Sequence, residues 1–120
     1  MQKRSLLGQA GEDLACRFLE KKGYSILERN FRNGRRGEID IIAKKGSLIA
    51  FIEVKARSSL KYGTGLEAVT YTKQERISEA AEVFLFYKGW LQPMPPISFD
   101  VIEIYYKDKK AYISHHQGVF

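Results

Sequence analysis

The chain has 120 residues and 44% hydrophobic content, which predict a single domain (1–120) with its own core and argue against disorder. Twenty basic residues against fourteen acidic ones leave a net charge of +6, which favours a polyanionic partner such as nucleic acid. One cysteine excludes an internal disulfide, and no apolar run approaches the length of a membrane span, so we expect a cytoplasmic protein without a membrane partner.

The first predicted element is an amphipathic helix that begins after Ser5 and ends at Gly23. Its apolar residues recur at three- and four-residue spacings: Leu6, Leu7, Ala10, Leu14, Ala15, Phe18 and Leu19. Gly8 and Gly11 are unfavourable inside a helix, so they indicate close approach of a backbone or ligand. Glu12 lies at the edge of the apolar stripe, where it either reaches a site on the neighbouring sheet or is solvated.

A strand is predicted over Tyr24–Phe31, followed by the basic turn 32–37. Arg35 and Arg36 in this turn either grip phosphates or form an ordinary solvated loop. Both interpretations stay open at this point.

Residues 37–55 predict a hairpin of two apolar strands joined at Gly46-Ser47. If those two residues form the loop, Lys45 pairs with Leu48 and the register sets Asp40 opposite Glu53. The same register sets Glu38 opposite Lys55. Alternation places the acids on one face of the hairpin, and the residues expected on the other, buried face are Ile39, Ile41, Ile52 and Val54.

Opposed carboxylates about 5 Å apart, at an effective dielectric of ~20, repel by roughly 3 kcal/mol. Lys55 supplies one compensating charge, and a divalent metal would supply the rest. Oxygen ligands without a Cys–His cluster point to Mg²⁺ or Mn²⁺ rather than zinc. The alternative is an ordinary hairpin whose polar face is solvated, with Glu38 and Lys55 as a surface pair.

The segment 56–65 is predicted to be a basic loop that flanks a substrate or is simply exposed; it contains Arg57 and Lys61. Thr72 with Glu75 predicts a capping box for a helix over Lys73–Lys88. Lys73, Gln74 and Arg76 in its first turn face either the site or solvent, and the pattern favours solvent for any one of them.

Two further strands are predicted over Ile97–Tyr106 and Ala111–His115. Asp100 lies mid-strand among apolar residues and is expected to pair with a buried base, whereas His115 and His116 are expected at the surface. Cys16 is expected in or near the core. The element order α-β-β-β-α-β-β predicts a single-domain α/β (mixed α+β) fold.

Four stretches resemble the PD-(D/E)XK, or restriction-endonuclease-like, superfamily: Gly11-Glu12, Gly37–Ala43, Phe51–Arg57 and Phe99–Val101. The likeness covers most of the chain, and the pattern is most similar to the small bacterial family of uncharacterised endonuclease-like proteins typified by YraN. Ile39-Asp40 stands in for the literal Pro-Asp. Ser78 replaces the tyrosine that RecB-like nucleases place four residues after Gln74, which weakens any helicase-linked role.

The resemblance implies that Asp40, Glu53 and the Val54 carbonyl hold Mg²⁺ or Mn²⁺. It also implies that Lys55 orients or activates the attacking water. Glu12 matches the helical carboxylate of the related archaeal Holliday-junction resolvases, and it is the candidate for a second metal.

The leading hypothesis is therefore a Mg²⁺-dependent endonuclease that acts on DNA rather than RNA, with branched or repair intermediates among its substrates. Residues expected to hold the nucleic-acid backbone are Arg35, Arg36, Arg57, Lys61 and Lys73. The alternative is a non-catalytic nucleic-acid-binding module that retains the nuclease fold. Because junction resolvases pair up to make two cuts, a homodimer is an open alternative.

Overall fold

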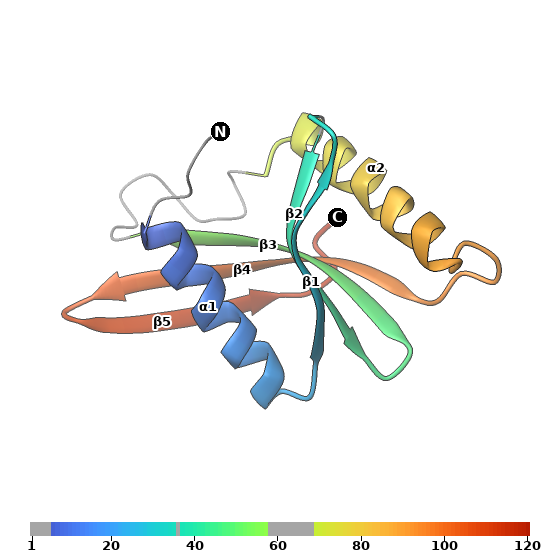
Figure 1. Ribbon diagram of the computed structural model, residues 1–120. Coiled ribbons are helices and arrows are strands. Elements are labelled where there is room, and N and C mark those ends of the chain that lie inside the picture. Colours follow the sequence, from blue (N-terminus) through green and yellow to red (C-terminus); the bar gives the residue numbers. More distant parts are fainter. Residues whose placement is uncertain (1–5, 36, 58–68) are drawn as a thin grey trace.

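The computed structural model describes residues 6–35, 37–57 and 69–120, and it shows five strands and two helices (Figure 1). In chain order the elements are α1 (Leu6–Lys21), β1 (Ser25–Asn33), β2 (Gly37–Lys45), β3 (Leu48–Arg57), α2 (Tyr71–Lys88), β4 (Ile97–Lys107) and β5 (Lys110–His116). The strands form one sheet in the order β1-β2-β3-β4-β5, in which only β3 and β4 are parallel. The predicted mixed α+β fold and element order are confirmed.

The two helices pack on opposite faces of the sheet, because side chains of β3 alternate between two cores. Ala50 and Ile52 face the α1 side, together with Leu19 and the buried Cys16. Ile49 and Phe51 face the α2 side, where they meet a cluster that includes Ile77, Ala80, Ala81, Phe84 and Leu85. Helix α1 therefore covers the middle of the sheet, and α2 covers β1 and β2.

Helix α2 begins two residues earlier than the sequence predicts. Its N-cap is Thr70, whose hydroxyl oxygen accepts a hydrogen bond from the Lys73 backbone N–H at 3.2 Å. The predicted capping box of Thr72 and Glu75 is therefore wrong. The helix ends as expected at Gly89, which adopts φ 73° and donates to the Phe86 carbonyl. No helix in the described part of the chain is long and apolar enough to cross a bilayer.

Two glycines allow the helices to approach the sheet closely. A Cβ atom at Gly11 in α1 would lie 2.9 Å from the Cβ of Ala56, so the close neighbour of this glycine is a side chain of β3 rather than the predicted backbone or ligand. A Cβ atom at Gly37 would lie 2.8 Å from the backbone carbonyl oxygen of Arg76. The start of β2 therefore touches the backbone of the first turns of α2 directly.

Asp100 is fully buried and pairs with a histidine. One of its carboxylate oxygens lies 2.8 Å from Nε2 of His115, and the other accepts a hydrogen bond from the Gly118 backbone N–H at 3.0 Å. The expectation that Asp100 has a buried basic partner is confirmed. The surface placement of His115 is wrong, because its side chain is 2% exposed and lies edge-on to the rings of Phe18 and Tyr24. His116 keeps about a third of its side chain exposed and lies 2.7 Å from Glu103.

Candidate functional site

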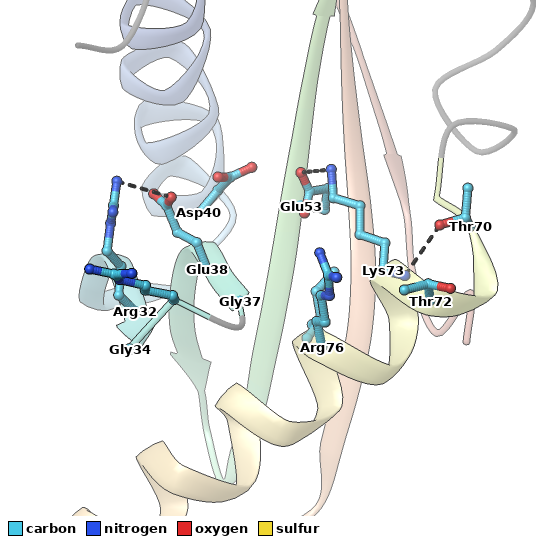
Figure 2. Close-up of a pocket in the computed structure, with 12 residues that line it drawn as sticks. Arg32, Gly34, Gly37, Glu38, Asp40, Glu53, Thr70, Thr72, Lys73 and Arg76 are labelled. Carbon is cyan, nitrogen blue, oxygen red and sulfur yellow. Dashed lines mark hydrogen bonds and ion pairs between the residues drawn. The ribbon is translucent and has the colours of Figure 1, made fainter. Parts of the chain in front are cut away.

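The sheet forks between β2 and β3. The predicted register is confirmed at the turn, where Lys45 pairs with Leu48, and the paired residues continue as far as Ile41 and Ile52. Beyond that point β2 stays paired with β1 as far as Gly37, and β3 stays paired with β4 as far as Arg57. Asp40 and Glu53 are the next residues on the two separating strands, and Figure 2 shows them on either side of the gap.

Strict alternation fails on β2 at the fork. Ile39 and Ile42, three residues apart, both pack in the α2-side cluster, whereas Ile41 packs on the α1 side. The prediction that Ile39 shares a face with Ile41 is therefore wrong. This local irregularity accompanies the separation of β2 from β3 and places Asp40 within the fork.

At the fork, the Asp40 carboxylate replaces a backbone carbonyl of β2 as the hydrogen-bond acceptor for β3. Its Oδ2 atom accepts a hydrogen bond from the Val54 backbone N–H at 2.8 Å, which fixes the orientation of the side chain. The N–H and C=O of one strand residue point to the same neighbouring strand in an antiparallel pair. The carbonyl of Val54 is therefore also directed toward the β2 side, where a ligand at the fork would meet it.

Burial and a second acid act together on Asp40. Burial raises its pKa most, the negative charge of Glu53 raises it further, and Glu12 adds to the effect. The hydrogen bond from Val54 opposes these contributions, but the pKa of Asp40 still rises from 3.8 to about 7. Burial and the neighbouring carboxylate therefore disfavour the charged form of Asp40.

Two lysines supply positive charge to Glu53. Nζ of Lys73 lies 3.1 Å from Oε1 of Glu53, and Nζ of Lys55 lies 3.7 Å from the same oxygen. Burial, followed by its neighbour Lys73, lowers the pKa of Lys55. Burial also acts to lower the pKa of Lys73, but the charge of Glu53 and the hydrogen bonds of Lys73 outweigh it and raise that pKa.

A pocket of about 650 Å³ opens over the two acids (Figure 2). Its wall combines the turn after β1, the start of β2 and the first turns of α2, which the contact at Gly37 holds close together. The lining residues are Arg32, Gly34, Arg35, Gly37, Glu38, Asp40, Glu53, Thr70, Thr72, Lys73, Arg76 and Ile77. Figure 2 shows the side chain of Arg76 directed from α2 toward the space between the acids.

Glu12 is buried beside the fork, but on the α1 side of the sheet. Its carboxylate lies 3.7 Å from the guanidinium of Arg29, and its charge contributes to the raised pKa of Asp40. Among residues 6–35, 37–57 and 69–120, no three His, Cys, Asp or Glu side chains converge into a complete metal site. Asp40 and Glu53 therefore form the core of the candidate site, and Glu12 contributes to its electrostatics.

The predicted phosphate-holding residues fall into three groups. Arg35 and Lys73 line the pocket. Arg57 lies at the end of β3, where it pairs with Tyr105 of β4, so the prediction of a loop is wrong for residues 56 and 57. Arg36 and Lys61 lie outside the described residues.

Glu38 does not pair with Lys55 as the register predicted. It lies opposite Arg32 across the β1–β2 pair, with 3.6 Å between the two charged groups, because the fork separates β2 from β3 at this level. Sequence reasoning also missed Arg32, Thr70 and Thr72 as pocket residues and favoured solvent for Arg76. The three-residue spacing from Lys73 to Arg76 would have indicated a shared helical face.

Residues 11–104 match the sequence model of the uncharacterised protein family UPF0102. The chain belongs to the UPF0102 family. A UPF0102 protein of Syntrophomonas wolfei is 46% identical over 114 residues, which cover 95% of this chain and 96% of that protein. One from Caldicellulosiruptor saccharolyticus is 50% identical over 105 residues, with 88% and 86% covered. One from Clostridium perfringens is 54% identical over 98 residues, with 82% and 78% covered.

Proposed function

We propose that this UPF0102 protein is a PD-(D/E)XK-type nuclease that hydrolyses phosphodiester bonds in DNA with the help of Mg²⁺ or Mn²⁺. The observation that carries the proposal is the fork, where two buried carboxylates face a pocket ringed by basic side chains. A purely structural acid pair would not need Arg32, Arg35, Lys73 and Arg76 around an open cavity. A phosphate backbone and a divalent ion fit both features together.

The residues present fit a divalent ion. Burial and then the charge of Glu53 on the facing strand raise the pKa of Asp40, so a cation between the two acids would favour the charged form of both. Asp40, Glu53 and the Val54 carbonyl would hold the ion. Mg²⁺ suits such a site because it is commonly bound by one or two carboxylates together with water and substrate phosphate. Mn²⁺ accepts the same oxygen ligands.

Hydrolysis requires that water attack the phosphorus while the bond to the leaving oxygen breaks. When bound, the ion would supply positive charge that stabilises the charge developing on the phosphate. Because its lowered pKa makes Lys55 give up its proton more readily than an ordinary lysine, its Nζ can orient the attacking water and accept a proton from it. Arg76 and Arg35 would hold the phosphate backbone, with Asp40 and Glu53 positioned by the two strands.

Nucleic acid is the expected substrate class because the pocket offers charged groups suited to a phosphate backbone, and within that class we propose DNA. Arginine binds phosphate through paired hydrogen bonds, which give salt-sensitive binding with little sequence preference. Branched and repair intermediates remain part of the proposal.

Cleavage assays test this function. The protein is incubated with supercoiled, linear, single-stranded and four-way-junction DNA, and with RNA, in Mg²⁺ or Mn²⁺. We expect cleavage of at least one DNA substrate, and a loss of about 10²-fold or more in Glu53→Ala and Lys55→Ala. Glu82→Ala, which removes an exposed acid of α2, is the matched control and should cleave like wild type.

Two results would contradict the proposal. Cleavage that survives both site substitutions would come from another site or from a contaminant. Binding that falls steeply with salt, without cleavage of any substrate, would replace the nuclease by a nucleic-acid-binding module that retains the fold.

A further inference from the structure

Glu53 is approached by two ammonium groups, and the closer one comes from the helix rather than from its own strand. Nζ of Lys73 lies 3.1 Å from Oε1 of Glu53, compared with 3.7 Å for Nζ of Lys55. Figure 2 shows the Lys73 side chain extending from the first turn of α2 across to Glu53. Lys73 therefore makes the tighter contact with the acid of β3 that is proposed to bind the ion.

The backbone of Lys73 is held by hydrogen bonds, whereas its side chain is partly exposed. The first turn of α2 is held by the bond from the Lys73 N–H to Thr70 and by the bond from the Gln74 side chain to the Val69 carbonyl. The side chain of Lys73 is 36% exposed, compared with 21% for Lys55. Lys73 can therefore leave Glu53 for the solvent-facing part of the pocket, whereas Lys55 is more enclosed.

We propose that Lys73 neutralises Glu53 until a divalent ion binds, and that the ion then displaces its ammonium group toward the phosphate-binding wall of the pocket. This inference rests on the proposed metal-dependent function. A divalent cation held by Glu53 would repel an ammonium group 3.1 Å from the same carboxylate, because like charges at such short range repel even where water screens them in part. Arg76 lies one helical turn further along α2 and lines the same wall, so the displaced ammonium group would join it there.

The exchange couples two binding events. A phosphate that attracts Lys73 away from Glu53 makes that carboxylate more available to the ion. By thermodynamic linkage, the ion must raise the affinity for phosphate by the same factor. Lys73 therefore acts as a positioning residue that makes ion binding and backbone binding mutually favourable.

The first test measures the Mn²⁺ affinity of the full chain without nucleic acid, by electron paramagnetic resonance of the free ion. We expect Lys73→Met to bind Mn²⁺ about fivefold more tightly than wild type, because the competing ammonium group is gone. Lys107→Met removes the same charge from the exposed far end of β4 and should leave the affinity unchanged. Circular dichroism establishes that each variant is folded, and Lys73→Gln replaces Lys73→Met if the latter is not.

The second test adds a short phosphorothioate oligonucleotide as a slowly cleaved probe. We expect the probe to raise the Mn²⁺ affinity of wild type and of Lys107→Met, and to raise that of Lys73→Met clearly less. Equal increases in all three proteins would overturn the coupling.

The outcomes separate this inference from the function on which it rests. If Glu53→Gln binds Mn²⁺ as tightly as wild type, the metal site itself is wrong, and with it the proposed function. If Glu53→Gln loses Mn²⁺ but Lys73→Met binds no more tightly than Lys107→Met, only the displacement of Lys73 is overturned.

Discussion

The sheet buries an aspartate on each of two strands that flank β3, and the surroundings of the two side chains differ. Asp100 of β4 is fully buried, and both of its oxygens have a defined partner, His115 and the Gly118 N–H. Asp40 of β2 is almost as deeply buried, but it faces another acid across the fork, and its pKa rises to about 7.

This difference gives a criterion for distinguishing a buried acid that stabilises the fold from one that is a candidate ligand-binding residue. A buried carboxylate whose oxygens are satisfied by the fold stabilises the fold. A buried carboxylate that faces another carboxylate is costly to ionise, and a cation between the two lowers that cost. The two sites therefore differ in compensation rather than in burial, and each prediction below can break or sharpen this contrast.

The largest expected effect is on the pH dependence of stability. Because the folded-state pKa of Asp40 lies above its ordinary value of 3.8, the folded protein holds the proton more tightly than the unfolded chain. The stabilising contribution is fully present below about pH 4 and is lost as pH rises through about 7. The loss is up to about 4 kcal/mol in the free energy of unfolding.

This prediction is measured by chemical denaturation in a chelator, with Asp40→Asn as the reference. Because asparagine does not titrate, we expect wild type to lose stability relative to Asp40→Asn between about pH 4 and 7. A constant difference across that range would mean that Asp40 is compensated as well as Asp100 is.

Asp100→Ala should give the next largest effect, a loss of about 3 kcal/mol in the free energy of unfolding. The substitution leaves the buried side chain of His115 and the Gly118 N–H without their partner. Urea denaturation measures the loss. Glu103→Ala removes a more exposed acid–histidine contact from the same strand and should cost clearly less. Equal losses would show that burial does not set the value of such a pair.

We expect divalent ions to stabilise the folded protein by binding at the fork, and not at the acids of β4. At a Mg²⁺ or Mn²⁺ concentration of 100 times the dissociation constant, we expect a gain of about 2.7 kcal/mol, seen as a rise in Tm. Asp40→Ala should abolish the gain, whereas Glu103→Ala should keep it. A wild-type Tm that does not respond to either ion would remove the physical basis of the metal site.

The smallest expected effect is on the stability contributed by the N-terminus of α2, the helix whose basic side chains line the pocket. Thr70→Ala removes the cap that accepts from the Lys73 N–H and should cost about 1 kcal/mol, measured by urea denaturation. Thr72→Ala should cost much less, because Thr72 lies inside the helix. The reverse order would restore the capping box that the sequence predicted.

Local patterns were enough to predict the elements and the hairpin register. Period-two burial and the Gly46-Ser47 turn fixed the pairing of Lys45 with Leu48, because side-chain alternation leaves little freedom in a buried hairpin. The same register brought Asp40 and Glu53 to the same level. The acids of the candidate site could therefore be found from the sequence.

Features that depend on packing could not be found this way. At the fork, β2 stays paired with β1, and β3 stays paired with β4. No local sequence signal shows that the pairing of β2 with β3 stops at Ile41. The partner of Asp100 lies fifteen residues away on the next strand, so two adjacent histidines near the end of the chain resembled surface residues. Two threonines two residues apart offered alternative helix starts, and tertiary contacts decided between them.

The contact between Gly37 and the Arg76 carbonyl has a consequence for engineering. Because main-chain atoms are in contact there, the distance between the acids and α2 does not depend on which side chains the helix carries. Substitutions at residues 73 and 76 should therefore leave that distance unchanged, whereas a methyl group at position 37 would force the backbone of α2 away from β2 and move every cation on that helix at once.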